Sequence, residues 1–104
     1  MQIKVIHKAF EDTATHVATV SAPHAVVTEA LEFAYRYTNN IDGSWSMKIG
    51  SDANDAVEVV APLYTDADGK QWGHRSTSVG DVMIVEGVEY TVSGFGFTKV
   101  EEAA

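Results

Sequence analysis

The sequence predicts an α+β domain in which one α-helix packs against a bent, antiparallel β-sheet. Two observations predict this class. Residues 24–38 carry apolar side chains at helical spacing, whereas several shorter segments alternate apolar and polar residues, as strands do. The length of 104 residues is usual for one domain, and no repeat or low-complexity tract divides the chain. We therefore expect residues 1–104 to form a single domain whose sheet curls towards a half-barrel.

The N-terminal region is predicted to form two strands. Residues 2–10 alternate, with Ile3, Val5 and His7 on one side. After a short polar break, residues 16–20 form the second candidate strand, which contains β-branched side chains. A hairpin is the simplest connection between the two.

Residues 24–38 are predicted to form the helix. Ser21 is a candidate N-cap, and Pro23 lies near the first turn, where its missing N–H costs little. Glu32 and Arg36 have the spacing and order of a favourable ion pair on the exposed face. The apolar stripe that we expect to face the sheet consists of Val26, Ala30, Phe33 and Tyr37, with Val27, Leu31 and Ala34 beside them.

The middle of the chain is predicted to be mostly loop. Residues 39–56 are rich in Asn, Asp, Gly and Ser, and a short strand at residues 45–49 is expected to interrupt them. Residues 57–63 alternate as a strand, and Pro62 favours a place at the edge of the sheet. A tight turn is predicted at residues 66–69.

The C-terminal third has the clearest β pattern. Residues 82–85 and 88–92 are predicted to form a hairpin closed by the two-residue turn Glu86–Gly87. Aromatic residues at every second position continue the pattern over residues 94–97. Residues 101–104 are predicted to be a frayed tail.

The composition narrows the classes of function. There is no cysteine, which excludes disulfides, thiol catalysis and thiolate zinc sites. Fifteen acidic and seven basic residues give a formal net charge of −8, so direct binding to a phosphate backbone is not expected. The N-terminus lacks the pattern of a signal peptide, and no apolar run reaches the roughly 18 residues of a membrane span. We expect a soluble, cytoplasmic protein.

Acidic residues are concentrated in residues 51–68, which contain no Lys or Arg. The ordinary interpretation is a charged surface that keeps the protein soluble. The sharper interpretation is a surface that imitates nucleic acid or docks on a basic partner. Trp45 and Trp72 flank this segment, and each is either a core residue or an anchor of an interface. The acidic residues considered as contacts are Asp52, Asp55, Asp66 and Asp68.

The segment 73–81 combines hydroxyl, imidazole, guanidinium and carboxylate groups. A catalytic triad of Ser76, His74 and Asp81 is not expected, because neighbouring side chains in an extended segment point to opposite faces. The serines and Asp81 are typical of residues that satisfy loop amides. The alternative is a recognition loop with Arg75 as its directional donor. The candidate contacts in this segment are His74, Arg75, Ser76 and Ser78.

No metal or cofactor site is predicted. The four histidines, His7, His16, His24 and His74, lack the spacing of a metal site. Residues 66–69 resemble the start of a calcium loop, but the twelfth position, which needs a bidentate Glu, is Thr77.

Two blocks of the sequence resemble a known family. Residues 75–82 (RSTSVGDV), with Gly87, Tyr90 and residues 94–97 (GFGF), resemble the end of YodL-like domains, which occur in proteins of plasmids, conjugative elements and phages. Thr77 departs from the Leu or Met common in that family.

Similar short phage proteins also carry an upstream segment that matches residues 35–40 (YRYTNN) and 43–46 (GSWS). Together the blocks cover about a third of the chain. The resemblance implies a mobile-element setting and no established enzymatic activity, and it carries over no catalytic residue.

Three functions are therefore expected, in decreasing order. The first is a non-catalytic accessory protein of a phage or mobile element that binds and modulates a host protein. The second is an acidic nucleic-acid mimic that inhibits a host defence nuclease. The third is a small-ligand or enzymatic domain built on His74, Arg75 and Asp81. A homo-oligomer is compatible with each of these functions.

Overall fold

A computed structural model describes residues 1–100; the predicted tail, residues 101–104, lies outside the described residues. The elements are, in chain order, β1 (Gln2–His7), β2 (Thr15–Ser21), α1 (Val27–Arg36), the 3₁₀-helix η1 (Gly50–Asp52), β3 (Val57–Val59), β4 (Tyr64–Thr65), β5 (Gln71–Trp72), β6 (Val82–Val85), β7 (Val88–Ser93) and β8 (Gly96–Lys99).

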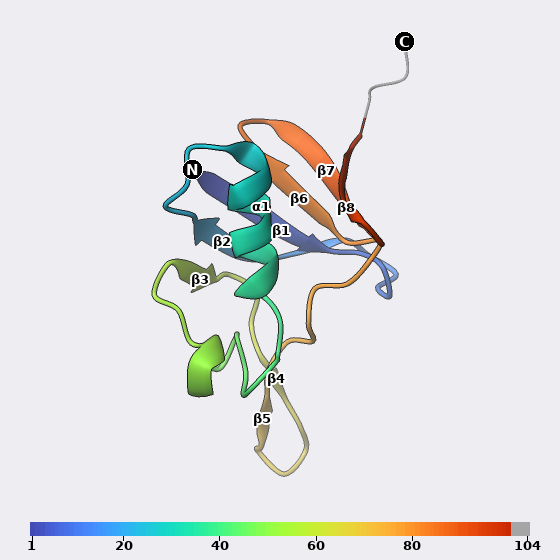
Figure 1. Ribbon diagram of the computed structural model, residues 1–104. Helices are drawn as coiled ribbons and strands as arrows, with labels where there is room; N and C mark the ends of the chain where they lie inside the picture. The colour runs from blue at the N-terminus through green and yellow to red at the C-terminus, as the bar shows by residue number, and fades with distance from the viewer. Residues whose placement is uncertain (101–104) are drawn as a thin grey trace.

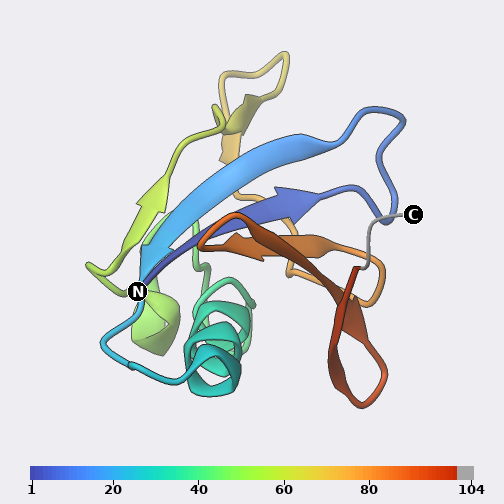
Figure 2. The same ribbon diagram turned by 90° about the horizontal axis from the view of Figure 1, so that it is seen from above.

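Six strands form one antiparallel sheet in the order β3-β2-β1-β6-β7-β8. Helix α1 lies across one face of this sheet (Figure 1), and the view from above shows that the sheet is curved (Figure 2). Strands β4 and β5 pair with each other in a separate two-stranded sheet and project from the body as a hairpin. The predicted α+β class, with one helix on a bent antiparallel sheet, is confirmed.

Strand β1 lies inside the sheet between β2 and β6, and its alternation gives it one fully buried face. Ile3 and Val5 are buried on the helix side together with His7, as the alternation predicts. The strand ends at His7, earlier than the predicted residue 10. The reason is that the next two backbone N–H groups, of Lys8 and Ala9, donate to the Asp81 carboxylate instead of to a neighbouring strand.

Helix α1 is shorter than predicted, and its N-cap differs. Ser21 belongs to β2, and the N-cap is Val26, whose side chain cannot cap and is 55% exposed. The helix ends at Arg36, where the side chains of Thr38 and Asn39 donate to the carbonyls of Ala34 and Tyr35. The residues that the helix buries against the sheet are Ala30, Leu31 and Ala34.

The middle of the chain departs most from prediction. The expected strand at residues 45–49 is wrong, because only an isolated bridge between Ser44 and Ile49 forms there. Of residues 57–63, only 57–59 form a strand, which lies at the sheet edge as predicted. The predicted turn at residues 66–69 is confirmed as the loop between β4 and β5.

The C-terminal hairpin is confirmed. Strands β6 and β7 pair in the register that places Val85 opposite Val88, which leaves Glu86 and Gly87 as the turn. Both turn residues have positive φ angles, 52° and 78°. This conformation matches the right-handed twist of the flanking strands. Strand β8 then adds to β7 and completes the sheet.

Among residues 1–100, no helix is long and apolar enough to cross a membrane.

Candidate functional site

The ten residues predicted as contacts do not form one surface. Trp45 and Asp52 are fully buried, which corrects their assignment as contact residues. His74, Arg75, Ser76 and Ser78 are half-buried in a segment that packs on the body. The residues that remain at least partly exposed outside that segment are Asp55, Asp66, Asp68 and Trp72.

Arg75 is engaged inside the molecule. Its guanidinium donates to both oxygens of Glu11, to both oxygens of Asp81 and to its neighbour's carbonyl, that of Ser76, at 2.7–3.0 Å. A guanidinium has five N–H donors, and these five bonds use them all. The Phe10 ring lies against the group, 4.9 Å from its central carbon to the ring centroid. The prediction of Arg75 as the directional donor of a recognition loop is therefore corrected: its donors bind its own chain.

Asp81 is the centre of this arrangement. Its side chain is fully buried and accepts hydrogen bonds from the backbone N–H groups of Lys8, Ala9 and Ser78, besides those from Arg75. Burial by itself raises the pKa of Asp81, but the bonds from Arg75 and the three amides outweigh it and hold the pKa well below the usual range. A carboxylate so fully bonded joins the end of β1 to the start of β6.

A chain of buried hydrogen bonds continues from this point to the helix. The Thr38 hydroxyl donates to the carbonyl of Ala34, and the Thr77 hydroxyl donates to Thr38 at 2.9 Å. The Thr77 hydroxyl must then accept a hydrogen bond from Nε2–H of His7, also at 2.9 Å, which fixes the His7 tautomer with its proton on Nε2. Burial, and then the nearby Arg75, lower the pKa of His7 to about 4. His7 is therefore neutral at pH 7.

The remaining residues of segment 73–81 hold the loop 39–46 in place. His74 stacks on the buried Trp45 ring, and its Nε2 bonds to the carbonyl of Ala61. The Trp45 indole donates to the carbonyl of Arg75, and the Ser76 hydroxyl accepts from the N–H of Asn40. The two motif blocks therefore pack against each other in the folded chain.

Asp52 holds the loop at residues 41–43 by accepting hydrogen bonds from its backbone N–H groups. One oxygen accepts from the backbone N–H groups of Ile41, Asp42 and Gly43, and the other accepts from Arg36 at 2.9 Å. The N–H of Gly43, followed by the other donors, lowers the pKa of Asp52. The predicted pair between Glu32 and Arg36 is wrong, because Arg36 pairs with Asp52 instead.

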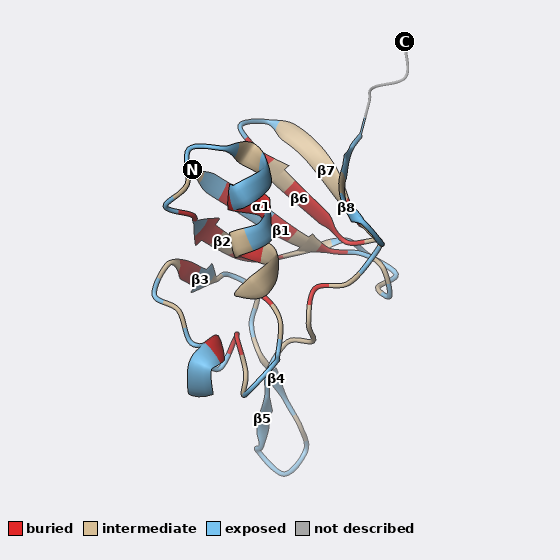
Figure 3. Cartoon of the chain, viewed as in Figure 1, coloured by how far each residue is buried: buried red, intermediate tan, exposed pale blue. Residues whose placement is uncertain are grey.

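The hairpin β4–β5 is the most exposed part of the described chain (Figure 3). Tyr64 and Trp72 lie directly opposite each other in its ladder, so both rings are on one face. They are 67% and 48% exposed. The Trp72 indole donates to Asp66 at 3.0 Å, and the Lys70 ammonium lies 4.2 Å from the Trp72 ring centroid. The hairpin therefore presents two large aromatic side chains, with the Trp72 ring held in position.

Sequence reasoning found Trp72 but missed Tyr64. The sequence does contain a pattern that predicts the pair: Tyr64 and Trp72 flank the predicted turn at residues 66–69, at positions that lie opposite each other across a short hairpin. Gly73 ends the hairpin where it meets the body. A side chain there would lie within 3 Å of the hydroxyls of Ser44 and Ser46 and would displace them from the hydrogen bonds that they accept from the N–H groups of Met47 and His74.

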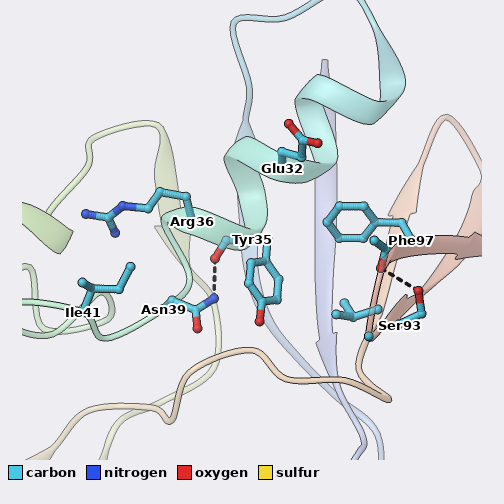
Figure 4. A pocket seen from close by; sticks show the side chains of 10 residues that line it. Glu32, Tyr35, Arg36, Asn39, Ile41, Ser93 and Phe97 are labelled. Carbon is cyan, nitrogen blue, oxygen red and sulfur yellow. Dashed lines mark hydrogen bonds between the residues drawn. The ribbon is translucent and has the colours of Figure 1, made fainter.

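A second feature lies between α1 and the β7–β8 hairpin. It is a pocket of about 470 Å³, shown in Figure 4. Tyr35 and Phe97 meet edge-to-face in it, with ring centroids 6.1 Å apart. Its lining includes Glu32, Tyr35, Asn39, Ile41, Val92 and Phe97.

Within residues 1–100, no group of three or more histidine or acidic side chains is arranged to hold a metal ion. Comparison of the sequence with protein-family models finds no match, and neither curated proteins nor solved structures match significantly. The resemblance to YodL-like domains therefore stays a prediction from the sequence.

Proposed function

We propose that this protein is a non-catalytic accessory protein of a mobile element that docks on a host protein through the β4–β5 hairpin. The observation that carries the proposal is the exposed pair of Tyr64 and Trp72 on a projecting hairpin. Tyr and Trp dominate the binding energy of many protein interfaces, because their large rings gain much from leaving water.

The hairpin is also prepared for binding. The bond from Trp72 to Asp66 and the nearby Lys70 ammonium hold the ring, so less side-chain entropy is lost when it is buried. The Asp66 carboxylate also accepts hydrogen bonds from the backbone N–H groups of Asp68 and Lys70, and these bonds fix the turn. A rigid hairpin with an aromatic pair suits insertion into an apolar cleft of a partner.

Charge favours a basic partner. The formal net charge of −8 steers the protein towards positively charged surfaces. Asp68 lies exposed in the turn of the same hairpin. We infer a partner with an apolar cleft and a basic rim.

The mobile-element and host-cytoplasm parts of the proposal depend on the motif resemblance described above. The alternatives have less support. Asp52, one of the four acidic residues considered for nucleic-acid mimicry, is buried and cannot contact a partner. Arg75 and Asp81, two of the residues considered for an enzymatic role, bond to each other inside the molecule. The contacts thus favour binding through the hairpin.

The test is an affinity pull-down from bacterial lysate with the tagged protein, at low and high salt, read by mass spectrometry. Three baits are compared: the parent, the double variant Tyr64→Ser/Trp72→Ser, and Phe95→Ser. The last is a matched control, because Phe95 is a fully exposed aromatic on a different hairpin.

The expected result is one protein that the parent and Phe95→Ser retain at both salts and that the double variant loses. The dissociation constant for the purified partner should be at least 100-fold higher for the double variant, because two hot-spot side chains are removed. Equal retention by all three baits would exclude the hairpin as the site. Recovery of DNA-binding enzymes at low salt alone would favour mimicry instead.

A further inference from the structure

Strand β8 is an open edge of the main sheet. The sheet order places it at one end, with β7 as its only neighbour among the described residues. In an antiparallel ladder, alternate residues direct their N–H and C=O groups to the neighbour and away from it. The N–H of Val100 donates to the Glu89 carbonyl of β7, so the backbone groups of Thr98, two residues earlier, also point towards β7. The backbone groups of the alternate residues, Phe97 and Lys99, therefore point away from β7.

The opposite edge of the sheet is protected. Strand β3 has only three residues, and the Lys48 ammonium donates to the carbonyl of Val57 on its outer side. Short edge strands and lysines at the edge prevent the addition of a further strand. Strand β8 is also short and carries one lysine, Lys99. The two edges differ in their backbone groups: the outward carbonyl of Val57 on β3 is bonded, whereas the outward groups of Phe97 and Lys99 have no hydrogen-bond partner among the described residues.

The open edge borders the pocket between α1 and the β7–β8 hairpin. Phe97, whose backbone groups are free, also lines the pocket with its side chain. A strand paired with β8 places the residue opposite Phe97 on the same face, so its side chain enters the pocket. The seat is largely apolar, formed by Tyr35, Val92 and Phe97, as Figure 4 shows for the two aromatic rings.

The charged side chains at the rim of this pocket indicate the charge of its ligand. Arg36 is neutralised by Asp52. Glu32 is exposed and makes no ion pair with any of the described residues. An unpaired carboxylate at the rim, in a protein of formal net charge −8, favours a cationic group nearby.

We propose that the groove between α1 and β8 binds an extended peptide segment by strand addition. The peptide pairs with the free backbone groups of Phe97 and Lys99, seats an apolar side chain in the pocket and places a Lys or Arg beside Glu32. This is recognition by β-augmentation, in which backbone bonds supply affinity and side-chain pockets supply specificity. It is a second site, separate from the β4–β5 hairpin, and does not depend on that hairpin's partner.

The test uses the full chain and a phage-displayed library of random ten-residue peptides. Enriched peptides are synthesised, and their dissociation constants are measured by fluorescence polarisation. The decisive variant is Lys99→Pro, which removes an N–H that points away from β7 and so leaves the β7–β8 ladder bonded. Lys99→Ala is its control, because it removes the same side chain and keeps the N–H.

We expect enriched peptides that combine an apolar residue with Lys or Arg. Lys99→Pro should weaken binding at least tenfold, whereas Lys99→Ala should change it less than threefold. Glu32→Gln should weaken the binding of peptides that contain Lys or Arg more than the binding of peptides without them. Peptide binding should slow hydrogen exchange at the Phe97 and Lys99 amides. The double variant Tyr64→Ser/Trp72→Ser should bind the peptides as the parent does.

Four outcomes would overturn the proposal. One is a library in which no peptide is enriched above an unrelated immobilised protein. Another is binding that Lys99→Pro leaves unchanged. The third is a stable dimer of the parent, measured by sedimentation, that Lys99→Pro dissociates, because β8 would then pair with a second copy. Loss of peptide binding in the hairpin double variant alone would assign the peptides to the hairpin instead.

Discussion

His7 shows how a single buried residue couples this fold to pH. Its imidazole is 2% exposed and donates to Thr77, while Arg75, Asp81, Glu11 and His74 are the charged or titratable groups around it. Burial dominates and holds its pKa near 4, against about 6.5 in the unfolded chain. Between these values the unfolded chain binds a proton that the folded chain does not. Lowering the pH through this window therefore favours unfolding.

The free energy of unfolding should fall by about 3 kcal/mol as the pH is lowered from 6.5 to 4, the linkage equivalent of this shift. Urea denaturation at a series of pH values measures it. The variant His7→Gln should lose most of the slope between pH 6.5 and 4.5. Equal slopes in the parent and the variant would show that His7 does not control it.

A second residue prediction concerns Asp81. Asp81→Asn should lower the free energy of unfolding at pH 7 by about 3 kcal/mol or more, because it leaves the Arg75 charge and three amides imperfectly paired. Glu11→Gln alters the same guanidinium at a partly exposed site and should cost less than about 1 kcal/mol. Chemical denaturation of both variants checks the difference, and equal losses would contradict the central place of Asp81.

Asp81 also adds to the acid sensitivity. Because its pKa is lowered by folding, its contribution is complete above the unfolded value of about 3.9 and is lost as the pH falls below it. The Asp81 effect therefore begins where the His7 effect ends, which lets the two be separated in one pH series.

At the scale of elements, the start of α1 is the clearest weakness. Val26 occupies the N-cap with extended backbone angles and no capping bond. Val26→Ser should raise the free energy of unfolding by about 1 kcal/mol, because it supplies a capping hydroxyl, and with Glu29 at the third helical position it forms a capping box. Thermal denaturation measures the gain.

The control for this prediction is Val26→Ala, which removes the same exposed side chain without adding a cap. It should change the stability by less than about 0.5 kcal/mol. A gain in Val26→Ala equal to that of Val26→Ser would mean that the loss of the exposed valine, and not the cap, is responsible.

At the scale of the whole molecule, the formal net charge of −8 opposes the compact state through self-repulsion. Raising NaCl from about 10 to 200 mM shortens the Debye length from about 30 Å to less than 10 Å. We expect the free energy of unfolding to rise by an amount on the order of 0.5 kcal/mol, the scale of exposed charge interactions. A fall on adding NaCl would mean that the ion pairs of Arg36 and Arg75 outweigh the repulsion.

Elements that depend on local order in the chain were predicted correctly. The alternation of Ile3, Val5 and His7 fixed the buried face of β1, and the turn Glu86–Gly87 fixed the register of the C-terminal hairpin. These features follow from the two-residue period of a strand and from φ angles that few residues accept. The structural interpretation of segment 73–81 also agrees with its internal bonds.

Long-range contacts, which local sequence does not reveal, set which polar side chains are internal. Arg36 pairs with Asp52 and not with the nearer Glu32, and Arg75 reaches Glu11 from 64 residues away. Trp45 is in the core while Trp72 is on the projecting hairpin, although both lie in similar polar sequence. The burial of a charge or a ring depends on partners that only the folded chain brings together, and the local periodicity of the sequence does not reveal them.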